Sequence, residues 1–190
     1  MAIGGAEWWK WALSVPLSQS PITDPDGEFG SQNQTGSVWF LAGNFGGTSE
    51  RSITIPAGKS IFFPLINIWN DWPCPDPNFK PGPGQTLEEF LAAGAAPYID
   101  VTNALSARVD GVELQNLFNY RGVSKLTTFT ADPTQIAIDP CITGDKQYAV
   151  SDGYWIMLTP LTPGKHTIQF SSATTTGFSL DVTYHVTVKK

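Results

Sequence analysis

The apolar residues near the start of the chain have helical spacing. Trp8, Ala12 and Val15 fall at positions i, i+4 and i+7, which predicts an amphipathic helix over residues 7–15 that ends near Pro16. A helix of about two turns is not stable by itself. We therefore expect its tryptophan-bearing face to pack against the rest of the protein.

A second helix is predicted over residues 87–94, where the polar pattern marks its first turn. Thr86 and Glu89 have the spacing of a capping box, in which each side chain accepts a hydrogen bond from the backbone amide of the other residue. The helical spacing continues as far as Gly94, and Pro97 permits one further short helical turn.

The remaining segments are short runs of β-branched and aromatic residues, many of which alternate between apolar and polar positions. The alternation is clearest over residues 180–188, which predicts a strand with one buried face. Asp110 and Gly111 lie between two such runs and are a strong hairpin signal. Pro64, inside another run, indicates an edge strand or a bulge.

Roughly ten such runs, spaced by about 8–12 residues, are typical of a sandwich or jelly roll. No internal repeat, linker or low-complexity tract divides the sequence. We therefore predict a mainly β fold, in which residues 1–190 form one antiparallel, jelly-roll-like β-sandwich with two short helices.

Composition narrows the class of protein. Of the 190 residues, 41% are apolar, which is enough for a substantial core. The chain has 11 basic and 17 acidic residues, a formal net charge of −6, which argues against nucleic acid and anionic membrane surfaces as partners. No apolar run is long enough to predict a membrane span.

The two cysteines, Cys74 and Cys141, lie beside prolines in loop-like surroundings. They are too few for a structural zinc site, so they either form a disulfide or remain free thiols. A bridge would close a loop of roughly 67 residues and stabilise the fold by about 4 kcal/mol in the chain-entropy model. Because disulfides persist in oxidising compartments, we expect a secreted or periplasmic protein. The first residues have no signal-peptide pattern, so we expect any signal to have been removed.

Three acidic residues, Asp24, Asp26 and Glu28, alternate along a short loop with a glycine at its bend. Alternating carboxylates can converge on one hard cation, which makes these residues candidate Ca²⁺ ligands. The match covers only this short loop, and its Pro-Asp-Gly sequence is equally typical of a plain turn. Both interpretations remain open at this point.

The most distinctive stretch is residues 67–79, which follows a predicted strand. Its candidate ligand-binding residues are Asn67, Trp69, Asn70, Asp71 and Trp72. Aromatic rings beside amides and carboxylates suit stacking on sugar rings and hydrogen bonding to their hydroxyls, and the prolines would keep such a loop rigid. The alternative is that both tryptophans pack inward as a small satellite core.

Asp71 and His166 are candidate catalytic residues. A carboxyl group at position 71 could act as a general acid or base only with a second carboxylate at a suitable distance, for which Asp139, Asp145 and Asp152 are candidates. His166 shares a strand face with apolar residues, so the alternative is a hydrogen-bonded buried histidine. The spacings of the common hydrolase, zinc-protease and nucleotide-binding motifs are absent from the sequence.

Four segments carry a resemblance. They read VWFLAG at residues 38–43, IPAGKSIFFP at 55–64, DGYW at 152–155 and PGKHTI at 163–168. On these segments the chain is similar to a group of uncharacterised bacterial β-rich proteins that are expected to be exported. The resemblance spans roughly residues 7–188 and implies one exported β-rich domain; it implies no activity.

We therefore expect an extracytoplasmic binding module for a carbohydrate or another small polar ligand. One alternative is a secreted hydrolase or lyase that acts on a polysaccharide. A second is a structural protein that assembles into a homo-oligomer through the aromatic stretch or an edge strand. The solvent exposure of Trp69 and Trp72 is the observation that bears most directly on the first expectation.

Overall fold

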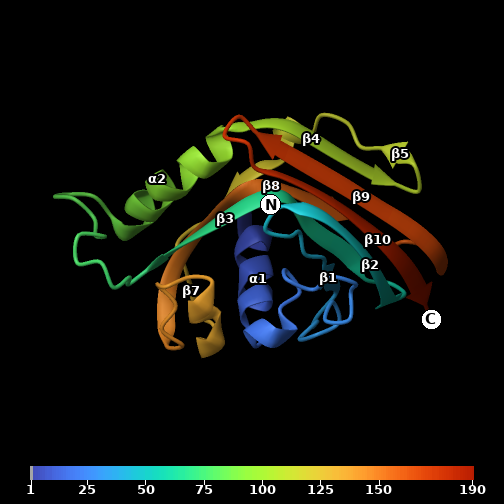
Figure 1. Ribbon diagram of the computed structural model, residues 1–190, viewed down its shortest axis with the longest axis horizontal. Helices are drawn as coiled ribbons and strands as arrows, with labels where there is room; N and C mark the ends of the chain where they lie inside the picture. Colours follow the sequence, from blue (N-terminus) through green and yellow to red (C-terminus); the bar gives the residue numbers. More distant parts are fainter. Residues whose placement is uncertain (1) are drawn as a thin grey trace.

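The computed structural model describes the backbone of residues 2–190 and the side chains of residues 4–190 (Figure 1). It is mainly β with two α-helices, α1 (Ala2–Leu13) and α2 (Leu87–Asp100). The ten strands are β1 (Val38–Phe40), β2 (Gly47–Pro56), β3 (Ser60–Trp72), β4 (Thr102–Val109), β5 (Val112–Glu113), β6 (Arg121–Val123), β7 (Thr127–Thr130), β8 (Lys146–Leu158), β9 (Gly164–Thr174) and β10 (Ser179–Lys189). Three short 3₁₀ helices are η1 (Leu17–Gln19), η2 (Leu117–Tyr120) and η3 (Pro133–Ala137).

The strands form two five-stranded sheets that pack against each other in a β-sandwich-like arrangement (Figure 1). The first sheet has the order β1-β3-β8-β6, with β7 also paired to β8, and the second has the order β2-β10-β9-β4-β5. Two of the pairs, β1–β3 and β2–β10, are parallel. The expectation of a purely antiparallel, jelly-roll-like sandwich is corrected on this point, because these pairs join segments that no hairpin links.

The space between the sheets holds the main core. Ile61 and Phe63 of β3 point toward Ile168 and Phe170 of β9, and the rings of Phe63 and Phe170 lie 4.9 Å apart. Along β10 every second residue is buried, as the alternation over residues 180–188 predicts. The period of two therefore assigns the inner face of this strand correctly.

α1 covers the opposite face of the first sheet (Figure 1). Its Trp8 is 1% exposed and packs near Trp155, whose ring stacks on Phe62 at 5.4 Å. The helix begins earlier than the predicted range because Gly4 and Gly5 let its backbone approach the sheet closely. A Cβ atom on Gly4 would lie 2.7 Å from the Phe62 ring.

α2 is a single helix that extends past its predicted end. The capping box of Thr86 and Glu89 is confirmed. The helix passes through Gly94, where a Cβ atom would lie 2.5 Å from the Asn70 amide nitrogen, and includes Pro97. Its buried residues, Leu91, Ala95 and Ile99, fall on one face that packs against β3 and β8.

β3 is longer than its apolar run. The strand was expected to end near residue 66, with a loop to follow, but it continues to Trp72 because β8 supplies a partner along its whole length. The pairing register shifts between Pro64 and Ile66, which confirms the bulge indicated by the proline.

Cys74 follows β3 and forms a disulfide with Cys141, as one of the two interpretations of the sequence has it. A disulfide is a hint of an oxidising, extracytoplasmic location. Among residues 2–190, no helix combines the length and the apolar character needed to cross a membrane.

Candidate ligand-binding groove

One edge of β3 is left without a strand neighbour. β1 runs beside β3 only as far as the Phe40–Phe62 pair, after which the Leu41 N–H donates to the Phe62 carbonyl at 3.0 Å. From there to Trp72, β8 is the only strand of the described chain that pairs with β3. The backbone of β3 therefore has no strand neighbour on the side away from β8, although Leu65 and Ile66 are buried there, at 0% and 7% exposed.

A cavity of about 490 Å³ lies along this edge, and we call it the edge groove. Residues 64–68 of β3 form its floor. Its walls include Trp9 from α1, Phe45 from the segment after β1, Tyr98 from α2, and Phe178 from the turn between β9 and β10. The groove thus collects side chains from several segments that are distant in the sequence.

The lining of the edge groove is apolar and uncharged. Within the described part of the chain it contains no Asp, Glu, Lys, Arg or His, and its polar side chains come mainly from Asn44, Asn67, Thr174 and Thr176. An ion transferred into such a site would lose its hydration without gaining a counter-charge. The groove therefore suits a neutral and largely apolar molecule.

Two aromatic side chains stand exposed at the groove. Phe45 is 55% exposed and Tyr98 is 63% exposed, although both belong to the lining. Apolar surface of this kind is stabilised when a ligand removes it from water. These two rings therefore add contact area for a molecule that enters between them.

Two buried donors in the lining have no hydrogen-bond partner among the described residues. They are Nε1 of Trp9 and Nδ2 of Asn67. The neighbouring Trp8, by contrast, donates its Nε1–H to the Leu41 carbonyl at 2.8 Å. An unpartnered buried polar group costs about 1–3 kcal/mol. Both atoms are covered by protein atoms, so an acceptor on a ligand would offset that cost once these side chains turn toward the groove.

A buried arginine braces the neighbouring wall. Arg51 is 1% exposed, and its guanidinium group donates five hydrogen bonds of 2.8–3.0 Å. The acceptors are the carbonyls of Ile22, Asp24, Ala42 and Gly43 and the hydroxyl of Tyr184. Burial raises the pKa of Tyr184, so this hydroxyl stays neutral. Because Ile22 and Gly43 also line the groove, the arginine fixes the backbone of that wall.

The five residues proposed from the sequence do not form one surface. They lie on β3 rather than in a loop, so successive side chains point to opposite faces of the sheet. Trp69 is 7% exposed and contacts Trp9 and Phe129, with ring centroids 5.8 and 5.0 Å away. Asn70 points the other way and donates to the Leu91 carbonyl at 2.8 Å.

The remaining members of that set also differ in their surroundings. Trp72 is half-buried and Asp71 is 2% exposed. Asn67 is the one member of the set that lines the edge groove. The alternative interpretation, an inward-packed satellite core, describes Trp69, which belongs to a buried cluster beneath α1.

Asp71 lies beside a second carboxyl group, that of Asp139. Burial, followed by the charge of Asp139, raises the pKa of Asp71 to about 8. Their oxygens and the Cys141 sulfur lie within 4.8 Å of one another, but this sulfur is bonded to Cys74 and is no thiolate ligand. The oxygens are closer together than the carboxyl pairs of most glycosidases, which lie about 5–9.5 Å apart. Asp152, another candidate partner, is bound instead by Arg121 at 2.7 and 3.0 Å.

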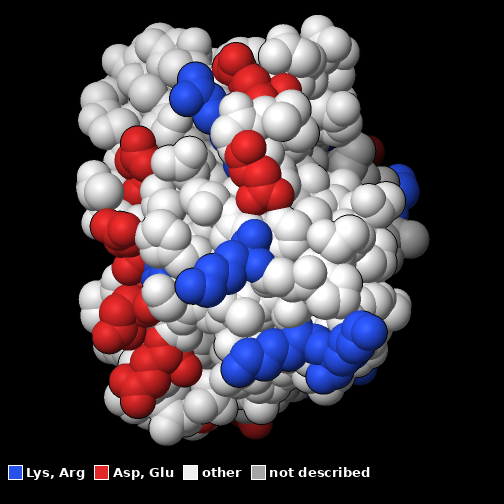
Figure 2. Space-filling model, turned by 90° about the vertical axis from the view of Figure 1, so that its right-hand side faces the viewer, with Lys and Arg blue, Asp and Glu red and all other residues white. Residues whose placement is uncertain are grey.

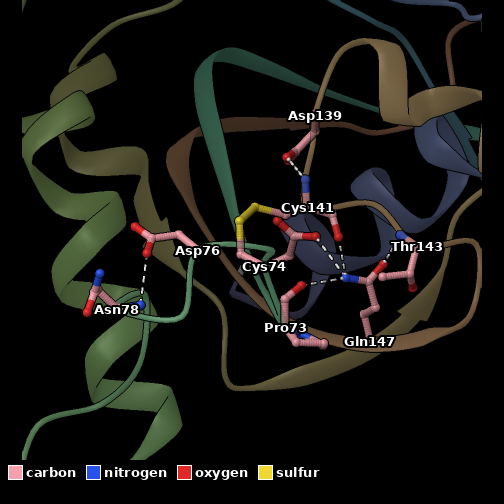
Figure 3. The surroundings of a disulfide bond; sticks show 9 residues. Pro73, Cys74, Asp76, Asn78, Asp139, Cys141, Thr143 and Gln147 are labelled. Atoms are coloured by element: carbon pink, nitrogen blue, oxygen red, sulfur yellow. Dashed lines mark hydrogen bonds between the residues drawn. A yellow bond between two sulfur atoms is a disulfide. The ribbon is translucent and has the colours of Figure 1, made fainter.

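Gln147 fixes the backbone around the disulfide (Figure 3). Its Nε2 group donates to the carbonyls of Cys141 and Pro73 at 2.8 and 3.1 Å, and its Oε1 accepts from the Thr143 N–H at 2.8 Å. Asp139 accepts a bond from the Cys141 N–H at 2.9 Å. The disulfide therefore belongs to a structured corner of the protein.

His166 is engaged through both ring nitrogens. Nδ1 lies 2.7 Å from Asp110 Oδ2, and Nε2 lies 2.8 Å from the Thr162 carbonyl. The hydrogen bond to Asp110 raises the pKa of His166 and lowers that of Asp110. His166 is on β9 of the second sheet, so the structure does not bring it together with Asp71 on β3. The hydrogen bonds of the alternative interpretation are present, but His166 is only partly buried and is not a core residue.

The acidic loop has the hydrogen bonds of a turn. Both carboxylate oxygens of Asp24 accept bonds from backbone N–H groups of the loop itself, those of Asp26, Gly27 and Phe29 at 2.8–3.2 Å. The Asp26 carboxylate accepts from the Glu28 N–H. These bonds compete with any cation for the same oxygens. The loop of Asp24, Asp26 and Glu28 thus has the geometry of a plain turn, which is the second of the two interpretations of its sequence.

Charge is distributed differently on the outer surface. Figure 2 shows a face on which acidic side chains gather mainly along the left side and near the top, while basic side chains lie in separate groups, most of them in the lower half. No family model, curated protein or solved structure matches the chain. The candidate site therefore rests on its own geometry.

The sequence signalled the groove only in part. Pro64 marked the edge strand, and Asn67 was among the candidate ligand-binding residues. The other wall residues, such as Phe45 and Phe178, lie in turns where an isolated aromatic residue gives no sign of what it faces. Their convergence depends on the pairing of distant strands.

Proposed function

We propose that the protein is an extracytoplasmic binding module whose ligand is a neutral, largely apolar molecule with at least one hydrogen-bond acceptor. The ligand occupies the edge groove. The observation that carries the proposal is the presence of two unpartnered donors, on Trp9 and Asn67, in the wall of an otherwise apolar and uncharged cavity.

The size of the groove supports binding of a small molecule. Its volume of about 490 Å³ falls within the range of about 300–1,000 Å³ that is typical of ligand pockets. The Cys74–Cys141 disulfide supports an extracytoplasmic location. Apart from the exposed Tyr98, the described lining has no titratable side chain, which favours binding over turnover.

The ligand class differs from the carbohydrate expected from the sequence. A sugar requires a hydrogen-bond partner for most of its hydroxyls, and the groove offers few. Among the residues expected to contact a sugar, Trp69 is buried, and the amide of Asn70 is bonded to Leu91. An apolar ligand with one or two acceptors satisfies the groove better.

The test is a titration with Prodan, a neutral naphthalene dye that carries one ketone oxygen and changes its emission on leaving water. We expect saturable binding to a single site. Gly43→Leu should weaken it by at least about tenfold, because the new side chain fills the groove. A Cβ atom at Gly43 has its nearest neighbour at 3.8 Å, so the substitution begins without a clash.

Gly82→Leu is the matched control, since Gly82 lies outside the groove and a Cβ atom there would also have its nearest neighbour at 3.8 Å. Thermal unfolding of both variants shows whether the fold is intact. Binding that does not saturate, or equal affinities for the two folded variants, would contradict the proposal.

A further inference from the structure

We propose that reduction of the Cys74–Cys141 disulfide converts the corner around it into a Zn²⁺ site, whose ligands are the two cysteine sulfurs and the carboxylates of Asp71 and Asp139. We call these four residues the disulfide corner. None of them lines the edge groove, so the inference is independent of the proposed function. Its basis is the convergence of two carboxylates, without a counter-charge, on a disulfide sulfur.

Two segments bring the four side chains together. Asp71 is near the end of β3 and Cys74 follows that strand, while Asp139 and Cys141 lie between η3 and β8. An oxygen of each carboxylate and the Cys141 sulfur all lie within 4.8 Å of one another. Figure 3 shows Asp139 and the bonded sulfurs of the two cysteines in this corner. Because the Cys74 sulfur is one bond away from that of Cys141, both cysteines can reach the same metal ion.

The Asp71 carboxylate is buried without a donor from another residue. It is 2% exposed, and within the described chain the one such donor near it is Gln147 Nε2, at 3.4 Å. That amide has two hydrogens, and its shorter bonds to the Cys141 and Pro73 carbonyls, at 2.8 and 3.1 Å, use both. Buried charged groups are normally paired or coordinate a metal. Asp71 is therefore a side chain whose burial a cation in this corner would compensate.

The disulfide corner also lacks a positive charge. Within residues 4–190, neither Asp71 nor Asp139 forms an ion pair with a lysine, arginine or histidine. Asp139 accepts one backbone hydrogen bond, from the Cys141 N–H at 2.9 Å. Two neighbouring carboxylates repel each other, and a divalent cation between them replaces this repulsion with attraction.

Reduction changes the donor set of the corner. A dithiol supplies two electrons and two protons and itself becomes a disulfide, the bond between Cys74 and Cys141 breaks, and each sulfur takes up one proton. Zn²⁺ then displaces both thiol protons and binds the thiolates. Two cysteines alone are too few for a structural zinc site, but the two carboxylates complete a set of four ligands.

The dimensions of the corner suit a tetrahedral Zn²⁺ ion. Zn²⁺ lies about 2.3 Å from thiolate sulfur and about 2.0–2.2 Å from carboxylate oxygen, which places neighbouring ligand atoms about 3.3–3.8 Å apart. The two oxygens and the Cys141 sulfur therefore need to approach one another by no more than about 1.5 Å, which side-chain rotations achieve. Cys74, Cys141 and Asp139 are partly exposed, so a reductant and a metal ion have access to them.

The experiment adds Co²⁺, a spectroscopic probe of Zn²⁺ sites, to the full chain after reduction with a phosphine. In that reduction the phosphine becomes a phosphine oxide, and water supplies its oxygen and the two thiol protons. Tetrahedral Co²⁺ with thiolate ligands has strong visible absorption bands that hydrated Co²⁺ lacks. We expect these bands at one Co²⁺ per reduced chain, their loss when Zn²⁺ is added, and no such bands with the oxidised protein.

Asp71→Asn should weaken Co²⁺ binding to the reduced chain by at least about tenfold, because one charged ligand is lost. Asp145→Asn is the matched control, since Asp145 is an exposed carboxylate in the same loop as Cys141, and should change the affinity by less than about twofold. If the Asp71→Asn variant does not fold, Asp139→Asn takes its place with the same expectation.

Circular dichroism shows whether each reduced protein is folded. A reduced chain that unfolds should regain its fold when Zn²⁺ is added. A reduced chain that stays unfolded with Zn²⁺ would overturn the inference. So would a folded, reduced wild type without the visible bands, equal bands in the oxidised protein, or equal affinities of the ligand variant and the Asp145→Asn control. None of these results alters the case for the edge groove.

Discussion

Two neighbouring groups of buried polar atoms are treated in opposite ways by this fold. The Arg51 guanidinium group is fully surrounded, and five of its hydrogen bonds reach protein acceptors. Across the adjoining groove, the buried donors of Trp9 and Asn67 have no partner among the described residues. Buried polar atoms of Trp39, Trp69, Thr102, Ser151 and Ser172 also lack a partner among the described residues, so what distinguishes the Trp9 and Asn67 donors is that their residues line the groove.

The two groups also divide the work of a binding site. The Arg51 cluster holds carbonyls of Ile22 and Gly43 in fixed positions, and both residues line the groove. A wall fixed in advance loses little entropy when a ligand binds. We interpret the Arg51 cluster as the part that keeps the wall of the groove rigid. The unpartnered donors of Trp9 and Asn67 are then the groups that bind the ligand.

The largest expected effect is a loss of stability when the hydrogen bonds of Arg51 are removed. Arg51→Met should lower the free energy of unfolding by at least about 3 kcal/mol, because the buried carbonyls of Ile22, Asp24 and Gly43 lose the hydrogen bonds that Arg51 donates. The Ala42 carbonyl and the Tyr184 hydroxyl also lose a bond from Arg51 but keep the hydrogen bonds that join them to each other's residue. Arg108→Met is the matched control, since Arg108 is exposed, and should change stability by no more than about 0.5 kcal/mol. Urea unfolding measures both. Similar losses of unfolding free energy in the two variants would mean that the buried hydrogen bonds of Arg51 do not stabilise the fold.

A pH series extends the comparison to two buried aspartates. Asp24 accepts three backbone N–H bonds, whereas Asp71 faces Asp139, and burial and this neighbour raise the pKa of Asp71 to about 8. A carboxyl group with a raised folded-state pKa binds its proton more tightly in the folded protein. Its stabilising contribution is complete below the unfolded-state pKa and is lost as the pH rises from about 4 through 8.

Asp71→Asn should therefore flatten this decline and exceed the wild type in stability at pH 9 by about 2 kcal/mol. The exposed Asp181→Asn serves as the control and should leave the decline unchanged. The measurement is the urea midpoint at several pH values between 4 and 9. If the stability of the Asp71→Asn variant had the wild-type pH dependence, the decline would not be due to the raised pKa of Asp71.

Two asparagines on the same strand separate satisfied from unsatisfied amides directly. Asn70→Leu should cost about 1–2 kcal/mol, because the Leu91 carbonyl loses its donor at 2.8 Å. Asn67→Leu should be neutral or slightly stabilising, because its Nδ2 has no partner to lose among the described residues. The same Asn67→Leu variant should bind Prodan about fivefold more weakly. Equal destabilisation by the two substitutions would break the comparison.

The smallest expected effect concerns the exposed rings. Phe45→Ala should weaken Prodan binding by about threefold to tenfold through lost contact area. Phe118→Ala is the control, because its ring is 50% exposed, close to the 55% of Phe45, and lies outside the groove. A titration in which both variants bind like the wild type would remove Phe45 from the site.

Local patterns in the sequence predicted local structure well. The alternation over residues 180–188, the capping box at Thr86 and the hairpin at Asp110 each depend on neighbours within a few positions, and each is present. The second half of β3 was predicted as a loop because Asn and Asp are rare in strands. There the strand exists because β8 pairs with it across a long sequence separation.

The candidate site was less accessible to prediction. Its walls come together through α1, α2 and the β9–β10 turn, and no periodicity in the sequence specifies how these elements pack on β3. The aromatic residues that drew attention, Trp69 above all, belong to the core. Pro64 was the one local signal of an open edge, and it marked the edge without showing what borders it.

The central claim is that the buried donors of the edge groove bind an acceptor on a ligand. Its most direct test is the indole N–H signal of each tryptophan in ¹H–¹⁵N NMR spectra during a Prodan titration. We predict that the Trp9 signal moves downfield as its Nε1 gains a partner, while the Trp8 signal, already bonded to the Leu41 carbonyl, keeps its hydrogen-bonded position. Saturable binding that leaves the Trp9 signal in place would contradict the account.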